Sequence, residues 1–129
     1  MEKKLITAAR EAKKHSYSPY SHFPVGAAVL LEDGQIFTGT NIENASYGLT
    51  CCAERVAIFS ARTATDTKIT ALAISIGQDS AELPKESLSP CGACRQVMAE
   101  FMAPENPVYI DGHRTFTVNE LLPNGFILK

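Results

Sequence analysis

Three cysteines and one glutamate have the types and spacing needed for metal-assisted chemistry. Cys91 and Cys94 lie three positions apart, so one helical turn would place both sulfurs on the same side of a helix. Cys52 supplies a third sulfur from a second predicted helix start. Three thiolates leave one position of a tetrahedral Zn²⁺ open for water, the arrangement of catalytic rather than structural zinc sites. The pattern therefore predicts a catalytic zinc ion held by Cys52, Cys91 and Cys94.

Glu54 is the predicted proton carrier of this site. It lies two positions after Cys52, and residues two apart on a helix point to different sides, so Glu54 need not be a ligand. Zinc lowers the pKa of its water toward about 7, and a carboxylate above that water can take a proton and later deliver it to a leaving group. A site of three thiolates carries a net negative charge that opposes this effect. We expect the helix N-termini, and Arg55 hydrogen-bonded to a thiolate, to offset it.

The fourth cysteine leaves an alternative open, a structural zinc site with four thiolates. Cys51 and Cys52 are adjacent, and neighbouring residues rarely both reach one metal, so Cys51 is expected to be a buried small hydrophobic residue. The three histidines fit no ligand spacing and are expected at the surface or at caps: His15, His22 and His113.

Composition excludes several classes of protein. Hydrophobic residues make up 45% of the 129 residues and charged residues 20%, which is typical of a globular protein and fits a single domain over residues 1–129. The net charge of −2 argues against a nucleic-acid partner. No apolar run has the length of a membrane span or a signal peptide, so we expect no membrane partner, a cytoplasmic location and reduced cysteines.

Hydrophobic periodicity predicts alternating strands and helices. Ser89 and Pro90 are expected to start the last long helix as N-cap and first residue. The right-handed crossover rule makes the strand after each helix parallel to its predecessor, which predicts a mixed sheet of the α/β class. The helices are expected over 2–16, 52–64 and 91–102, the strands over 25–31, 36–41, 69–76, 107–110 and 115–118, a polar loop over 77–89 and a last helical turn over 118–122.

Several separate motifs, in the same order and over nearly the whole chain, resemble the short, single-domain form of the cytidine deaminase family. The motifs are Glu-Ala-Lys-Lys at 11–14, Tyr-Ser-His-Phe-Pro-Val-Gly-Ala-Ala at 20–28, Asn-Ile-Glu-Asn-Ala at 41–45, Cys-Ala-Glu-Arg at 52–55, Ser-Pro-Cys-Gly-Ala-Cys-Arg-Gln at 89–96 and Glu-Leu-Leu-Pro at 120–123. The resemblance implies a three-layer α-β-α fold with a five-stranded mixed sheet. It also implies one Zn²⁺ per subunit, a homotetramer whose sites are shared between subunits, and deamination of cytidine and deoxycytidine to uridine and deoxyuridine in pyrimidine salvage.

The resemblance also implies roles for individual residues. Cys52, Cys91 and Cys94 would bind zinc, and Glu54 would carry protons to N3 and to the departing amine. The other implied substrate-binding residues are Ala53, Phe23 at the base, Ser89 through its carbonyl at the 4-amino group, Asn41 and Glu43 at the ribose 3′-hydroxyl, and Ala45, Tyr47 and Phe126 in a neighbouring subunit's site. An amide and a carboxylate together satisfy a hydroxyl's donor and acceptor. Without the resemblance, turn and capping chemistry would be preferred for Asn41 and Glu43, and a core position for Phe23.

Three other functions remain open at this point. A deaminase of a nucleoside antibiotic such as blasticidin S would use the same zinc chemistry, although the sugar contacts implied for Asn41 and Glu43 favour an ordinary ribose. An editor of polymeric nucleic acid would have to bind a flipped or single-stranded base, which the acidic balance disfavours. A zinc-stapled binding module without activity would need four thiolate ligands and no exchangeable water.

Overall fold

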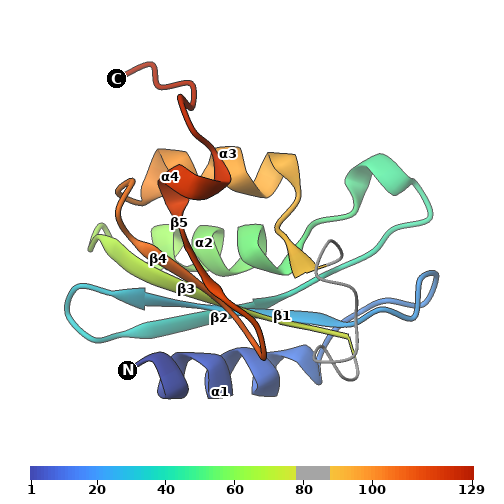
Figure 1. The fold of residues 1–129 in the computed structure, drawn as a ribbon. Coiled ribbons are helices and arrows are strands. Elements are labelled where there is room, and N and C mark those ends of the chain that lie inside the picture. The colour runs from blue at the N-terminus through green and yellow to red at the C-terminus, as the bar shows by residue number, and fades with distance from the viewer. Residues whose placement is uncertain (78–87) are drawn as a thin grey trace.

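A computed structural model describes residues 1–77 and 88–129 of the chain. Five strands form one sheet in the order β2-β1-β3-β4-β5. Helix α1 covers one face of this sheet, and α2 and α3 cover the other (Figure 1). The elements are α1 (Glu2–Lys13), β1 (Val25–Leu31), β2 (Ile36–Thr40), the short 3₁₀ helix η1 (Tyr47–Leu49), α2 (Ala53–Ala64), β3 (Ile69–Ile76), α3 (Gly92–Phe101), β4 (Pro107–Ile110), β5 (Thr115–Thr117) and α4 (Val118–Leu121). The expected three-layer α/β fold with a five-stranded mixed sheet is confirmed.

The strand directions follow the crossover prediction. Strands β1 and β2 form an antiparallel hairpin, and β3 pairs antiparallel with the other edge of β1, so β3 runs in the same direction as β2. Strand β4 pairs parallel with β3, and β5 returns antiparallel to β4. The strand after α2 and the strand after α3 are thus both parallel to their predecessors, as predicted, with β1 lying between β2 and β3.

Helix α1 is shorter than expected. It ends at Lys13 rather than near residue 16, and the next residues form three-residue turns, with the Lys14 N–H donating to the Glu11 carbonyl. The backbone leaves the helix because the Tyr17 N–H donates to the carbonyl of Asn41, which begins a short pairing with the segment after β2. This pairing places the loop between α1 and β1 next to the residues that follow β2.

Helix α3 begins at a different residue from the one predicted. Its N-cap is Cys91, whose Sγ accepts the Cys94 N–H at 3.4 Å, and the first helical residue is Gly92. The prediction of Ser89 as N-cap and Pro90 as first residue was therefore wrong, because a sulfur two residues later satisfies the free N–H group. Most of the expected polar loop over 77–89 lies outside the described residues.

Both faces of the sheet are buried. The larger cluster lies between the sheet and helices α2 and α3, and it includes Ile58, Leu72 and Met98. The smaller cluster lies under α1 and includes Leu5 and Ala73. A strand covered on both faces needs apolar side chains on both, which explains the uninterrupted burial along the inner part of β3. Among the described residues, no helix has the length and apolar character needed to cross a membrane.

Candidate metal centre and active site

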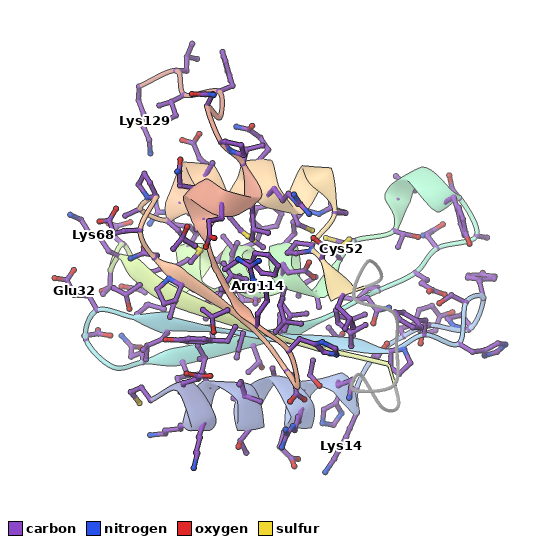
Figure 2. All side chains as sticks on the ribbon, viewed as in Figure 1. Lys14, Glu32, Cys52, Lys68, Arg114 and Lys129 are labelled. Atoms are coloured by element: carbon purple, nitrogen blue, oxygen red, sulfur yellow. The ribbon has the colours of Figure 1, made fainter. Side chains whose placement is uncertain are left out.

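The first residues of α2 and α3 meet at one end of the molecule and bring three sulfurs together. Cys52 is the N-cap of α2, Cys91 is the N-cap of α3, and Cys94 lies in the first turn of α3. The Sγ atoms of Cys52 and Cys91 are 3.7 Å apart, those of Cys91 and Cys94 are 3.2 Å apart, and all three lie within 4.8 Å of one another. Figure 2 shows Cys52 at the start of α2, beside the start of α3. The structure thus brings together the three cysteines that the spacing indicated.

The sulfur cluster fits a zinc ion. Zn–S bonds of about 2.3 Å in a tetrahedron place neighbouring sulfurs roughly 3.8 Å apart, close to the separations observed. The pKa values of Cys52 and Cys94 are shifted in opposite directions. Hydrogen bonds, first from Cys94 and then from Arg55, lower the pKa of Cys52 to about 5. Donation to Cys52, together with burial, raises the pKa of Cys94 well above its ordinary value. A dication compensates for the repulsion that would otherwise keep the three sulfurs from ionising together.

Glu54 lies in the first turn of α2 and is almost completely buried, with 4% of its surface exposed. Its pKa is raised to about 7, chiefly by burial and also by the charge of Cys52, against the opposing effects of hydrogen bonds and of Arg55. A carboxyl group that titrates near neutral pH can both accept and donate a proton under working conditions. The geometry therefore supports a proton-carrying role for Glu54.

Arg55 contacts the cluster from the same helix. Its Nη2 donates to Cys52 Sγ at 3.5 Å, and this contact raises the pKa of the guanidinium still further above its ordinary value. Its Nε is buried and has no hydrogen-bond partner among the described residues. The guanidinium is thus kept at the sulfurs although one of its donors is left unsatisfied there, which fits the neutralising role expected from the sequence.

Asn41 follows β2 and is buried, and its amide holds the loop that precedes β1. Its Oδ1 accepts the Val25 N–H at 2.9 Å and also the hydroxyl of Ser16. Its Nδ2 donates to the Phe23 carbonyl at 2.9 Å. These contacts are the turn chemistry that the sequence alone favours for this residue.

Glu43 has the same kind of partners. Its Oε1 accepts the N–H groups of Tyr20 and Ser21 at 3.0 and 3.1 Å, and its Oε2 accepts the Ser21 hydroxyl. The Ser21 hydroxyl bond is the main cause of a lowered Glu43 pKa. Asn41 and Glu43 together fix residues 16–25, so the loop that carries Phe23 is held to the strand ends. The sequence did not identify Ser16 and Ser21 as partners.

Three further residues were predicted to contact the substrate. Phe23 is half-buried and packs against the larger core cluster, and Ala53 is completely buried. Ser89 is half-buried, and its hydroxyl accepts a hydrogen bond from Arg95. Arg95 was not predicted as a functional residue, yet it also donates to the Pro90 carbonyl at 2.8 Å. Its position directly after Cys94 was the available signal, because a guanidinium one turn into α3 can reach back to the segment before the helix.

The residues expected to reach another subunit are exposed on this chain. Tyr47 lies on η1 with 76% of its surface exposed, and Phe126 lies near the C-terminus with 69% exposed. Ala45 is also exposed. In Figure 1 the teal segment between β2 and α2, which contains η1, extends away from the sheet, as does the C-terminal segment at the top. The fold of one chain does not bury these residues at its own sulfur cluster.

The remaining cysteine and the histidines lie outside the cluster. Cys51 is half-buried in a bridge with Ile42, and burial raises the pKa of its thiol. It is not one of the three sulfurs within 4.8 Å, so the geometry disfavours a site with four thiolates. His15 and His22 are exposed, as expected, and His113 is half-buried.

Comparisons with known proteins agree with this geometry. Residues 1–110 match the family model described as the cytidine and deoxycytidylate deaminase zinc-binding region. A cytidine deaminase from Halalkalibacterium halodurans is 46% identical over 126 residues, which cover 95% of this chain and 91% of that protein. A cytidine deaminase from Sporosarcina psychrophila is 45% identical over 127 residues, covering 95% of this chain and 89% of that protein.

A solved structure is similar to this chain in both fold and sequence. The crystal structure of cytidine deaminase from Burkholderia pseudomallei matches with a TM-score of 0.84 and 42% identity, covering 98% of this chain and 99% of that one. The fold and the thiolate cluster define a zinc-dependent enzyme that acts on carbon–nitrogen bonds. With the family match over most of its length, the chain belongs to the cytidine deaminase family.

Proposed function

We propose that this chain hydrolyses cytidine and deoxycytidine to uridine and deoxyuridine and releases ammonia, as a step of pyrimidine salvage. The observation that carries the proposal is the buried Glu54 carboxyl, with a pKa near neutrality, in the same helical turn as a cluster of three sulfurs. The relatives described above are named cytidine deaminases, which supports a cytosine nucleoside as the substrate and does not favour an antibiotic.

In the proposed mechanism, Cys52, Cys91 and Cys94 would hold the zinc. When bound there, zinc supplies the Lewis acidity that makes a water molecule nucleophilic near neutral pH. Glu54 takes a proton from that water and delivers it to N3 of the base as the oxygen adds to C4. Glu54 then takes the remaining proton from the hydroxyl now attached to C4 and delivers it to the exocyclic amine. The C4–N bond breaks as the C4 carbonyl forms, and ammonia leaves. Arg55 offsets the charge of the thiolates.

The proposed substrate contacts come from the loop around the strand ends. Phe23 would pack against the pyrimidine, Ala53 would belong to the substrate-binding residues, and the carbonyl of Ser89 would accept a hydrogen bond from the 4-amino group. Asn41 and Glu43 would contact the ribose 3′-hydroxyl. The burial of Asn41 and Glu43 and their hydrogen bonds to the loop before β1 support these sugar contacts, because both polar groups are held in fixed orientations before substrate arrives.

The proposal includes assembly and location. We propose a homotetramer in which Ala45, Tyr47 and Phe126 enter a neighbouring subunit's site; their exposure on the single chain supports this. The cysteines are free, and three thiolate ligands require a reducing compartment, so we place the enzyme in the cytosol. The slightly negative charge supports a free nucleoside rather than a nucleic acid as substrate.

Ammonia release from cytidine, with zinc measured on the same preparation, tests the proposal. We expect one zinc per chain, and turnover of cytidine and deoxycytidine but not of blasticidin S or cytosine in an oligonucleotide. Loss of absorbance with each substrate gives a second readout. A zinc-loaded protein that leaves both nucleosides unchanged would overturn the assigned activity.

A further inference from the structure

Gly39 lies where strand β2 passes under the first turns of α2. A Cβ added at this position would lie 2.4 Å from the backbone nitrogen of Ala57 and 2.8 Å from the carbonyl oxygen of Ala53. Both atoms belong to the helix backbone, which cannot rotate away as the end of a flexible side chain can. Glycine in a strand interior marks such a close approach of another backbone.

The strand cannot easily move aside to make room. Gly39 pairs with Ala27, next to the last pair of the β1–β2 ladder, which runs from Leu30–Ile36 to Gly26–Thr40, and beyond that end the Asn41 N–H donates to the Val25 carbonyl at 3.2 Å. An ordinary contact distance begins at 3.4 Å, so relieving the 2.4 Å approach requires a displacement of about 1 Å. Although β2 is the edge strand, its hydrogen bonds to β1 hold it on both sides of Gly39 along the chain, so we expect the first turn of α2 to shift.

That turn carries one side of the metal centre. Cys52 is the N-cap of α2 and Glu54 lies two residues later, whereas Cys91 and Cys94 come from α3. A shift of α2 therefore moves one sulfur and the carboxyl relative to the other two sulfurs. Ligand distances in zinc sites normally lie within about 0.2 Å of their standard values, so a displacement of about 1 Å would change the geometry of the cluster.

We infer that Gly39 is a positioning residue for the metal centre: its missing side chain sets how deeply the first turn of α2 lies on the sheet, and thereby where Cys52 and Glu54 stand relative to Cys91 and Cys94. The sequence gives no sign of this role, since Gly39 is 13 positions before Cys52 and has no side-chain functional group. The inference depends on the proposed zinc ligands but not on the identity of the substrate.

A second glycine on the same hairpin provides a matched control. A Cβ at Gly26 would lie 2.1 Å from the Ala9 carbonyl oxygen and 2.5 Å from the Lys13 nitrogen. These atoms belong to α1, on the opposite face of the sheet from α2 (Figure 1). Gly26→Ala thus introduces a clash of the same kind, with a helix that carries none of the three clustered sulfurs.

The test compares zinc release from purified Gly39→Ala, Gly26→Ala and wild-type protein. Each zinc-loaded protein is mixed with excess chelator at a temperature at which circular dichroism shows all three to be folded. We expect Gly39→Ala to lose zinc at least about tenfold faster than wild type, in the range found when residues supporting a metal ligand are changed. Gly26→Ala should release zinc within about threefold of wild type although its unfolding temperature falls. Equal release from Gly39→Ala and wild type, or equal acceleration in both variants, would overturn the inference.

A second pair of variants applies if Gly39→Ala is not recovered folded. Ala57 and Ala61 are both buried on the face of α2 that packs on the sheet, with 0% and 2% of their surfaces exposed. Ala57→Val enlarges the contact at the first turns, and Ala61→Val enlarges it at the far end of the helix. Faster zinc release from Ala57→Val alone supports the inference, and equal release from the two variants contradicts it. Because zinc release is measured without substrate, failure of the inference is distinct from failure of the proposed activity.

Discussion

At the scale of single residues, the site brings together acidic groups whose close packing would be unfavourable without a cation. Three sulfurs lie within 4.8 Å, and a carboxyl group is buried in the same turn as one of them. Arg55 is the cation that the chain itself brings to this group, through its contact with Cys52. The unequal pKa values of Cys52 and Cys94 are the consequence of crowding acidic groups, and a bound dication would remove the need for the sulfurs to share protons.

Replacing Glu54 by glutamine tests the proton-carrying role. Glutamine keeps the size of the side chain but cannot carry a proton between water and the base, so we expect kcat to fall by at least about 10²–10⁴-fold while zinc remains bound. Steady-state kinetics with cytidine and metal analysis on the same sample measure both quantities. Activity within tenfold of wild type, with zinc in place, would exclude Glu54 from the role.

Replacing Arg55 by alanine tests the neutralising contact. The Cys52 pKa is lowered to about 5 by hydrogen bonds, first from Cys94 and then from Arg55. Without Arg55 that pKa rises, protons compete better with zinc for the thiolate, and zinc is released at a higher pH during acidification. We expect affinity for zinc at neutral pH to fall by about tenfold or more.

A chelator-competition titration between pH 7 and pH 5 measures this shift. Arg55→Lys is the control, since it keeps a cation but not the planar fork, and its release curve should lie between those of the other two proteins. Zinc content and activity of Arg55→Ala that match wild type over the whole range would show that the contact contributes nothing.

At the scale of the elements, the hydrophobic pattern was enough to predict the bounds of a strand wherever burial of its side chains dominates. Strands β1 and β3 have the predicted bounds because burial on both faces gives nearly continuous apolar runs. Strand β4 also has the predicted bounds, although its residues alternate between buried and half-buried. The helix ends were less predictable. The start of α3 depends on Cys91 Sγ accepting the Cys94 N–H, and the end of α1 depends on Tyr17 pairing with Asn41, 24 residues later in the chain.

The sequence predicts those residues of the site whose side chains carry out the chemistry. Cysteine and glutamate at predicted helix starts can be recognised by residue type and position. Gly39, in contrast, acts through an absent side chain, and Arg95 acts by donating hydrogen bonds to backbone carbonyls. Gly39 leaves no signal in the sequence, and the signal for Arg95 was its position directly after Cys94. Such contacts depend on which elements the fold places together, which the spacing of residues does not specify.

An ion pair holds α1 to the sheet and gives the fold a predictable dependence on pH. Both Arg10 Nε and Nη2 donate to the carboxylate of Asp111, at 2.7 and 2.6 Å, and the Ser75 hydroxyl donates to the same group. The Arg10 hydrogen bonds are the main cause of the lowered Asp111 pKa. A carboxyl whose folded pKa lies below its unfolded value contributes stability above the unfolded value, and this contribution is lost as the pH falls through the folded pKa.

Asp111→Asn should therefore destabilise the protein at pH 7 and progressively less below the ordinary aspartate value of 3.8. We expect a loss of about 1–2 kcal/mol at pH 7, since the carboxylate is buried but its arginine partner is largely exposed to solvent. Urea unfolding of both proteins at pH 7 and pH 3 measures the difference, and the identical metal centres cancel in the comparison. A difference that does not shrink at pH 3 would assign the stabilisation to packing.

At the scale of the whole molecule, the most exposed large apolar residues include five on two segments that project from the body. Tyr47 and Leu49 on η1 and Phe126, Ile127 and Leu128 near the C-terminus are each more than half exposed. Both segments extend from the body in Figure 1. Large apolar side chains gathered on projecting segments are expensive to leave in water and are typical of surfaces that associate. Their position supports the proposed homotetramer with shared sites.

Sharing of sites between subunits can be tested by complementation. Glu54→Gln removes the proton carrier from a subunit's own site, and Tyr47→Ala removes the aromatic residue that the subunit would contribute to its neighbour. We expect each variant alone to be a tetramer with weak activity. In mixed tetramers, a Tyr47→Ala subunit supplies an intact Glu54 and an adjacent Glu54→Gln subunit supplies an intact Tyr47, so some sites are complete again.

The measurement is cytidine turnover after the two variants are mixed, dissociated by mild denaturant and reassociated, with light scattering to confirm the tetramer. Random mixing of equal amounts should restore roughly a quarter of wild-type activity, because each complete site needs the right type at two positions. Each variant passed through the same cycle alone is the control and should stay at its own low level. Tetramers whose activity equals the average of the two controls would show that each subunit completes its own site, since no combination of subunits would then restore what both lack.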